Sequence, residues 1–193
     1  MMLKVCGVTR PEDAELAVEA GASYVGIIIG AKSPRLVSPE RAKDIASVLP
    51  KHVKPVGVVD ARKRLDLETV LNSGVTVVQL HWGSPESFLE AKEVLSPYGV
   101  SVAVAPERAT PFKYEGAEYV LWDKKGWEEK FAFWGLRQGV AGIAGRITPD
   151  NVREVVAAFK PDLVDVSSGV EKEPGIKDPA KVRKVAEVIG LAL

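Results

Sequence analysis

The sequence contains few of the residues that build disulfide bonds and metal sites. Its 193 residues include one cysteine, Cys6, and two histidines, His52 and His81. A single cysteine excludes an internal disulfide bond and any metal site built from several thiolates. Two histidines argue against a histidine-rich metal centre. We therefore expect a protein that works without a bound metal.

The sequence also lacks an excess of charge and a long apolar run. It has 26 Lys and Arg residues and 26 Asp and Glu residues, and this balance argues against nucleic-acid binding as the main role. The densest apolar stretch, residues 24–31, is far shorter than the roughly 20 residues that span a bilayer. No basic region followed by a cleavable apolar segment begins the chain. We expect a cytoplasmic protein that binds no membrane.

What the sequence does contain is a regular alternation of short apolar runs and amphipathic runs. The apolar, β-branched runs predict strands at residues 3–6, 24–29, 55–59, 75–80, 100–104, 119–122, 140–144 and 163–166. Apolar residues at helical spacing predict helices over residues 11–20, 39–49, 64–72, 86–95, 149–159 and 179–189. Pro11, Pro39 and Pro149 fit the starts of three of these helices.

Two units in this series are irregular, because residues 105–115 contain two prolines and residues 128–138 are rich in aromatic side chains. Strand-then-helix units along the whole chain nonetheless predict an α/β fold, a single-domain (β/α)8 TIM barrel over residues 1–193. A doubly wound parallel sheet is the alternative. In either fold, ligands bind at the carboxyl ends of the strands.

Polar and nucleophilic residues follow the predicted strands. In chain order they are Cys6 with Gly7, residues 33–35, Asp60, His81, Pro106 with Glu107, Asp123, Gly145 with Arg146, and residues 167–169. The last group, Ser167, Ser168 and Gly169, offers two hydroxyls, backbone N–H groups and a glycine that permits close approach, as a phosphate requires. By itself such a tripeptide is more often an ordinary turn. In TIM barrels, however, phosphate sites recur at the loops after strands seven and eight.

Several motifs, taken in order, resemble those of phosphoribosylanthranilate isomerases. They are KVCGVTR at residues 4–10, KSPR at 32–35, VQLH at 78–81, TPDNV at 148–152, and DVSSGVE at 165–171 followed by GIKD at 175–178. The resemblance implies a cofactor-free Amadori rearrangement of N-(5-phosphoribosyl)anthranilate to 1-(2-carboxyphenylamino)-1-deoxyribulose 5-phosphate in tryptophan biosynthesis. It thus implies a phosphorylated small-molecule substrate, and the protein would be a monomer or a homodimer.

This reaction needs an acid that protonates the ribose ring oxygen and a base that removes the C2 proton. Cys6 matches the family's general base, although a lone cysteine is usually a small buried hydrophobic residue. Asp123 matches the general acid, although a strand-end aspartate often caps the next turn. The apolar Leu121 and Trp122 before Asp123 would help its carboxyl keep a proton.

The resemblance also implies substrate-binding roles. Arg35 matches the anchor of the anthranilate carboxylate, because a guanidinium forms paired hydrogen bonds with a carboxylate. Asp165 is a candidate for contacting the substrate, and His81 is either pocket lining or a structural histidine. The phosphate-binding residues would be Gly145, Ser167, Ser168 and Gly169, and Arg146 is a further candidate beside them.

The chain departs from the family pattern in three loops. Trp82 stands where the family usually has a glycine, and Arg146 replaces the second glycine of a Gly-Gly pair. Arg146 would add a contact to phosphate or point to solvent. Residues 124–130 replace a glycine-rich run. These changes affect the expected shape of the pocket and its lid, but not the acid and the base.

Two other functions stay open from the sequence. Another barrel acting on a pentose phosphate, such as an epimerase, would depend on a metal or a carboxylate pair, and the histidines that would hold a metal are missing. A sugar-phosphate-binding or scaffold protein without catalysis would have little reason to keep both Cys6 and Asp123.

Overall fold

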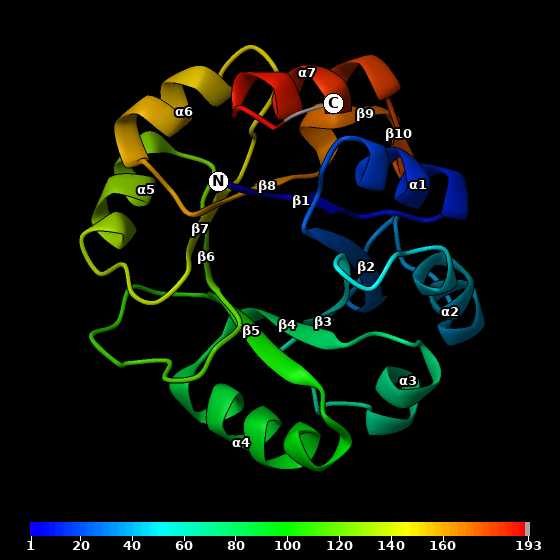
Figure 1. Ribbon diagram of the computed structural model, residues 1–193. Helices are drawn as coiled ribbons and strands as arrows, with labels where there is room; N and C mark the ends of the chain where they lie inside the picture. The colour runs from blue at the N-terminus through cyan, green and yellow to red at the C-terminus, as the bar shows by residue number, and fades with distance from the viewer. Residues whose placement is uncertain (192–193) are drawn as a thin grey trace.

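The computed structural model describes residues 1–191. Eight parallel strands form a closed barrel, in which each strand pairs with its sequence neighbours and β8 pairs with β1. The strands are β1 (Met2–Cys6), β2 (Tyr24–Gly30), β3 (Lys54–Asp60), β4 (Val77–Gly83), β5 (Ser101–Pro106), β6 (Val120–Asp123), β7 (Ala141–Ala144) and β8 (Leu163–Val166). Figure 1 shows the strands at the centre with helices around them. The predicted (β/α)8 barrel is confirmed, and the doubly wound sheet is wrong.

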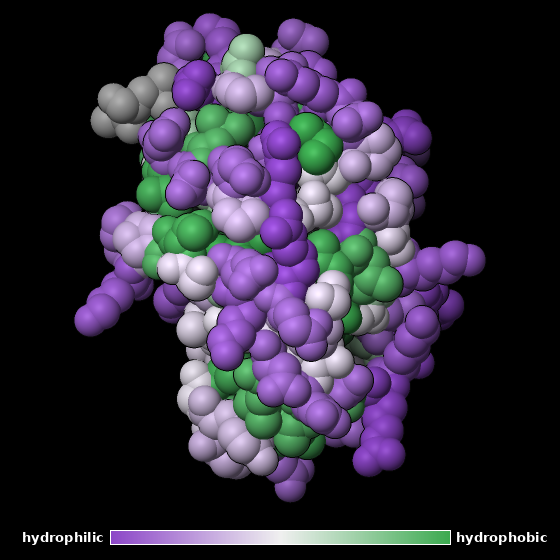
Figure 2. Space-filling view, turned by 90° about the vertical axis from the view of Figure 1, so that its right-hand side faces the viewer, coloured by the Kyte–Doolittle hydropathy of each residue, from purple (hydrophilic) through white to green (hydrophobic). Residues whose placement is uncertain are grey.

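The helices bury their apolar faces against the outside of the barrel. They are α1 (Pro11–Glu19), α2 (Pro39–Ser47), α3 (Leu67–Asn72), α4 (Pro85–Leu95), α5 (Trp127–Trp134), α6 (Val152–Phe159) and α7 (Pro179–Val188), with a short 3-10 turn, η1 (Ser96–Tyr98), after α4. On the side that carries α1, α2 and α3, separate apolar groups lie among hydrophilic ones (Figure 2). Within residues 1–191, no helix is both long enough and apolar enough to cross a bilayer.

Local chemistry explains where these helices begin. The side chains of Ser38 and Ser84 accept hydrogen bonds from backbone N–H groups in the first turns of α2 and α4. Helix α6 begins at Val152, later than Pro149 predicts. The Asn151 side chain accepts a hydrogen bond from the Thr148 N–H (2.9 Å), and this turn occupies the residues expected to start the helix.

In the described chain, no helix lies between β5 and β6, where the sequence shows poor helical periodicity. Aromatic packing replaces it. Tyr114 is buried edge-on against Phe88 and Phe112, and its N–H donates to Gln138 (2.7 Å). An irregular segment therefore covers this part of the barrel.

After β8 the chain forms a short 3-10 turn and a small antiparallel hairpin that the sequence patterns did not predict. The turn is η2 (Ser168–Val170), and the hairpin strands are β9 (Glu171–Glu173) and β10 (Ile176–Lys177). Lys177 reaches from this hairpin to the backbone carbonyl of Cys6, 2.5 Å away. The hairpin thus braces the end of β1.

Candidate active site

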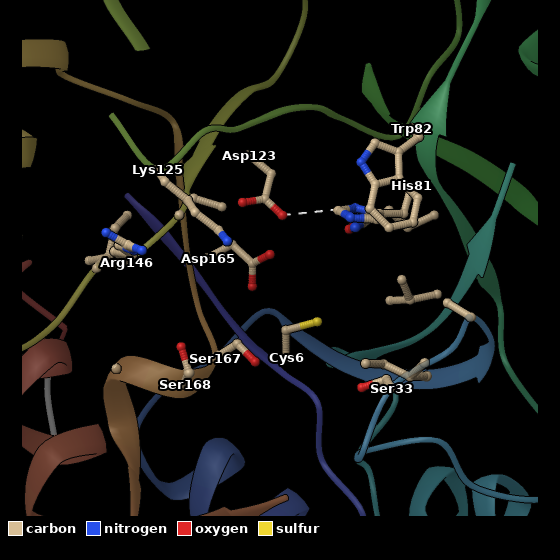
Figure 3. A pocket seen from close by; sticks show the side chains of 18 of the residues that line it. Cys6, Ser33, His81, Trp82, Asp123, Lys125, Arg146, Asp165, Ser167 and Ser168 are labelled. Carbon is tan, nitrogen blue, oxygen red and sulfur yellow. Dashed lines mark ion pairs between the residues drawn. The ribbon is translucent and has the colours of Figure 1, made fainter. Parts of the chain in front are cut away.

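A cavity of about 390 Å³ lies at the carboxyl ends of the barrel strands (Figure 3). It is lined by nearly all of the predicted site residues, which come from β1, β4, β6, β8 and the loops that follow β7 and β8. They are Cys6, His81, Asp123, Gly145, Arg146, Asp165, Ser167, Ser168 and Gly169. Arg35 is the one predicted site residue outside this lining. Lys125 and Trp82 also line the cavity, and neither was predicted from the sequence to bind the substrate.

Cys6 ends β1 and is 8% exposed. Gly26 on β2 makes room for its side chain, because a Cβ at that position would lie 2.6 Å from the Cys6 Sγ. Burial raises the pKa of the Cys6 thiol, while the charges of Lys4 and Lys177 act in the opposite direction. The thiol is therefore held in place at the cavity floor and is a strong base once it is deprotonated.

Asp123 ends β6, and its side chain is about one third exposed (34%). This position is more open than the apolar surroundings expected from Leu121 and Trp122. His81 Nδ1 lies 3.8 Å from Asp123 Oδ2 (Figure 3), which is too long for a hydrogen bond. Burial lowers the pKa of His81, so its ring is neutral at pH 7. The Asp123 carboxyl therefore remains available to a substrate.

Asp165 forms a buried ion pair with Lys4 inside the barrel, with Nζ and Oδ2 2.8 Å apart. Burial alone would lower the pKa of Lys4, but the charge and hydrogen bond of Asp165, together with Cys6 and Tyr119, outweigh it and raise that pKa well above its usual value. Lys4 is thus an ammonium ion that holds one carboxylate oxygen of Asp165. The other oxygen, Oδ1, is buried and has no hydrogen-bond partner among residues 1–191. Because Asp165 lines the cavity, this oxygen can accept a hydrogen bond from a substrate hydroxyl.

Hydroxyls, glycines and cations meet at the ends of β7 and β8. Ser167 and Ser168 lie on the same side of the cavity as Lys125 and Arg146 (Figure 3). Gly169 approaches the Ile147 carbonyl so closely that a Cβ would overlap it. This corner combines close backbone approach with positive charge, as a phosphate site requires.

A buried lysine from α5, Lys130, connects two of these loops. It is 3% exposed, and its Nζ donates to the carbonyls of Gly145 (2.9 Å) and Lys124. Burial lowers the pKa of this lysine. Lys130 ties the loop after Asp123 to the loop after β7. The sequence offered no signal for this role, because lysines are frequent in helices.

Arg35 faces an internal partner. Its Nε and Nη2 atoms donate to the two carboxylate oxygens of Glu171, at 2.7 and 2.6 Å. Glu171 also pairs with Lys177 (2.8 Å). Burial would raise the pKa of Glu171, but the hydrogen bonds from these two cations lower it, so Glu171 is a carboxylate. The role of Arg35 as a substrate anchor remains a prediction.

Comparison with known proteins identifies the family. The family model of N-(5'-phosphoribosyl)anthranilate (PRA) isomerase matches residues 3–188. The chain belongs to this family. The curated N-(5'-phosphoribosyl)anthranilate isomerase of Citrifermentans bemidjiense (strain Bem) is 37% identical over 206 residues, which cover 99% of this chain and 98% of the relative. The isomerase of Geotalea uraniireducens is 35% identical over 201 residues, with 94% and 95% covered.

Solved structures agree with this assignment. A phosphoribosylanthranilate isomerase in complex with reduced 1-(o-carboxyphenylamino)-1-deoxyribulose 5-phosphate is 30% identical, with a TM-score of 0.81 and 99% and 100% of the two chains covered. TrpF from Jonesia denitrificans is also 30% identical, with a TM-score of 0.81 and 97% and 96% covered. A structure of mutually generated monomers of the dimeric isomerase from Thermotoga maritima is 30% identical, with a TM-score of 0.79 and 99% and 100% covered.

The predicted activity is therefore confirmed. This enzyme is a phosphoribosylanthranilate isomerase of tryptophan biosynthesis, which converts N-(5'-phosphoribosyl)anthranilate to 1-(2-carboxyphenylamino)-1-deoxyribulose 5-phosphate. An epimerase and a non-catalytic scaffold, the two alternatives left open by the sequence, are set aside.

Two departures from the family pattern share one backbone feature. Trp82 has a φ of 58° and Arg146 a φ of 55°, in the left-handed region that favours glycine. These are the positions at which the resemblance implies glycine. The backbone shape there is one that glycine adopts without strain, and this chain adopts it with large side chains at a cost of about 1–3 kcal/mol each. Both side chains line the cavity.

Proposed function

We propose that Asp123 and Cys6 divide the proton transfers of the isomerisation between them. Asp123 gives its proton to the ribose ring oxygen, the bond from that oxygen to C1 breaks, and the nitrogen lone pair forms an iminium ion. Cys6, as thiolate, then removes the proton from C2 and leaves an enolamine. The enolamine gains a proton at C1 and loses its 2-hydroxyl proton, which gives the ketone. The observation that carries this proposal is that both side chains reach one cavity from different strands (Figure 3).

The chemistry of the thiol supports this order of events. The raised pKa of Cys6 keeps the thiol protonated in the free enzyme near neutral pH. Ring opening places a positive charge beside the sulfur, and this charge favours the thiolate at the step that needs it. The thiol gives its own proton to solvent water in the cavity, and the resulting thiolate then removes the proton from C2.

We propose that the substrate lies across the cavity with its phosphate at the ends of β7 and β8. The N–H groups and hydroxyls of residues 167–169, together with Gly145, Arg146 and Lys125, would bind the phosphate. The unpartnered oxygen of Asp165 supports a hydrogen bond to a ribose hydroxyl. His81, on the opposite side, would line the pocket near the sugar.

The anthranilate end then falls near the ends of β2, β3 and β4. We propose that Arg35 binds the anthranilate carboxylate with its Nη1 atom, because Glu171 occupies only Nε and Nη2. Ser33, which lines the cavity two residues before Arg35, supports this placement. In this reading Glu171 orients the guanidinium rather than competing with the substrate.

Acid–base chemistry alone completes this rearrangement, so we propose that the enzyme needs neither a metal nor an organic cofactor. We propose that residues 1–193 act as one catalytic domain in the cytoplasm. For the assembly we propose a monomer or a homodimer, since the Thermotoga maritima relative is described as dimeric.

The test of the proposed base is Cys6→Ser. We expect a folded variant whose kcat is lower by roughly 10²-fold or more, the scale of general base catalysis. The assay follows the decay of anthranilate fluorescence with freshly prepared phosphoribosylanthranilate. The thiolate is the active form and its pKa is raised, so the fraction of Cys6 present as thiolate should rise from neutral into alkaline pH, and kcat/KM can follow that rise only as far as Asp123 keeps its proton. Near-wild-type turnover of a folded Cys6→Ser enzyme would remove Cys6 from the mechanism.

A further inference from the structure

Trp82 is an additional residue in strand β4. The β4–β5 pairing joins His81 to Ala105 and Gly83 to Pro106, so two steps along β4 correspond to one step along β5. Trp82 therefore occupies a β-bulge, and its φ of 58° places it in the left-handed region. Bulges next to active sites re-aim a side chain. A strained conformation of this kind persists only where the surrounding structure holds it.

Neighbouring side chains fix the indole of Trp82. The Arg62 guanidinium lies 3.8 Å from the centre of the indole. Arg62 is itself held by Asp60, with hydrogen bonds of 2.9 Å from Nε and Nη2 to the two carboxylate oxygens. The His81 ring packs beside the indole, with ring centres 4.1 Å apart. The indole is thus oriented by contacts from β4 and from the loop after β3 before any ligand binds.

The indole belongs to the apolar side of the cavity, across from the phosphate corner. Strand β4 is directly opposite β8 in a ring of eight strands. Figure 3 shows Trp82 and His81 on one side and Arg146, Ser167 and Ser168 on the other. The apolar side chains of Ile28 and Val58 line the cavity with Trp82. A ligand with phosphate at one end and an aromatic ring at the other would therefore place its ring here.

We propose that Trp82 is a specificity-determining residue whose indole packs against the anthranilate ring of the substrate. Offset or edge-on packing of two aromatic rings is favourable beyond the burial of apolar surface. The Arg62–Asp60 pair is the support that keeps the indole in place. This inference rests on the proposed orientation of the substrate, with its phosphate at β7 and β8.

Two variants and two ligands test the role of Trp82. Trp82→Gly removes the indole and suits the left-handed backbone, whereas Trp82→Phe keeps an aromatic ring. Trp82→Gly should bind reduced 1-(o-carboxyphenylamino)-1-deoxyribulose 5-phosphate about tenfold more weakly. Inorganic phosphate, which has no ring, should inhibit it as it inhibits wild type. KM should rise more than kcat falls, and Trp82→Phe should restore most of the affinity.

A spectroscopic measurement separates direct contact from a structural effect. In the proton spectrum of the bound analogue, the ring current of an adjacent indole shifts the anthranilate signals, upfield where they lie over its face and downfield where they lie at its edge. We expect this shift to disappear in Trp82→Gly. It should persist in the control variant Trp127→Phe, because Trp127 lies on α5 and does not line the cavity. The melting temperature of Trp82→Gly should equal or exceed that of wild type, because glycine relieves the left-handed strain.

Three results would overturn the proposal. The first is equal weakening of the analogue and of inorganic phosphate in Trp82→Gly, and the second is a lowered melting temperature with unchanged analogue affinity. Either would assign Trp82 to the fold. The third is unchanged phosphate inhibition in a double variant, Arg146→Gly with Ser168→Ala, which removes a cation and a hydroxyl from the proposed phosphate corner. That result would contradict the substrate orientation on which the proposal rests. The roles of Cys6 and Asp123 are tested separately, by Cys6→Ser and Asp123→Asn.

Discussion

The side of the active face built by β8, β1 and the β9–β10 hairpin is crossed by buried ion pairs, whereas the side built by β4 and β6 is not. Lys4–Asp165, Arg35–Glu171 and Lys177–Glu171 all have N–O distances of 2.6–2.8 Å and partners that are mostly buried. On the other side, the one pair recorded across the described cavity is His81–Asp123, at 3.8 Å. The first side is preorganised, and the second leaves its carboxyl unbonded.

This difference matches the proposed division of labour. A phosphate anchor and a base must stay in register with the sugar throughout the reaction, and fixed charges achieve this without reorganisation. A general acid must exchange its hydrogen-bond partner as it releases its proton, so a carboxyl already bonded to a cation would be poorly suited. The contrast therefore predicts that substitutions on the two sides have different consequences. Those at Asp123 should lower kcat, and those in the ion pairs should lower stability.

The largest expected effect is on kcat, at Asp123 on the side built by β4 and β6. Asp123→Asn keeps the size of the side chain but has no acidic proton, so kcat should fall by roughly 10²–10⁴-fold. Affinity for the reduced product analogue should stay near that of wild type, because Asp123 is expected to bond the ring oxygen most strongly in the transition state. Turnover assays and analogue titrations on the same preparation measure both quantities.

A matched control is Asp150→Asn, which changes an exposed aspartate outside the cavity lining and should leave kcat unchanged. If Asp123 serves instead as a turn cap, its asparagine variant would lose about 1 kcal/mol of stability and keep its kcat. That outcome would move the general acid to another residue.

Much of this architecture is predictable from local sequence patterns. The eight apolar runs identify the barrel, because parallel strands buried on both faces need continuous apolar residues. The residues that end those runs then point to the active face, and this places Cys6, Asp123 and Ser167 at one cavity. Both steps depend on order along the chain, which a sequence displays directly.

The contacts that organise the site are not local, and the sequence patterns do not contain them. Arg35 and Glu171 are 136 residues apart. The hairpin that carries Glu171 and Lys177 has strands of only three and two residues, too short to show a period. The bulge at Trp82 is a matter of register between β4 and β5, and the spacing within β4 alone does not reveal it.

The side built by β8, β1 and the β9–β10 hairpin should lose stability when one of its buried charges is removed. Glu171→Gln leaves Arg35 and Lys177 without their carboxylate, and breaking a buried pair in this way costs about 3–5 kcal/mol. Urea unfolding measures the loss. Glu173→Gln, at an exposed position of the same strand, is the control and should change little. A Glu171→Gln enzyme as stable as wild type would mean that the ion pairs do not brace this side.

Arg35→Ala tests whether this side also binds the substrate. It should weaken analogue binding by about 1.5–3 kcal/mol, the value of a hydrogen bond to a charged group. Inhibition by inorganic phosphate should change less than analogue binding, because the hydroxyls and N–H groups of residues 167–169 remain in the variant. Arg153→Ala, an exposed arginine on α6, is the control. Loss of phosphate inhibition with intact recognition of the anthranilate carboxylate would reverse the proposed orientation.

The smallest expected effect lies at the junction of the two sides, where Lys130 bonds the loop after Asp123 to the loop of Gly145. Lys130→Met keeps most of the chain length but leaves both carbonyls without their donor, at a cost of about 1–3 kcal/mol in stability. Because Gly145 belongs to the phosphate corner, inhibition by inorganic phosphate should weaken severalfold, while the kcat at saturating substrate should stay close to wild type. Thermal unfolding and phosphate inhibition, with the exposed Lys51→Met as control, measure both effects. If kcat falls while phosphate inhibition is unchanged, Lys130 acts on the position of Asp123. The side of the active face built by β4 and β6 would then depend on this buried lysine.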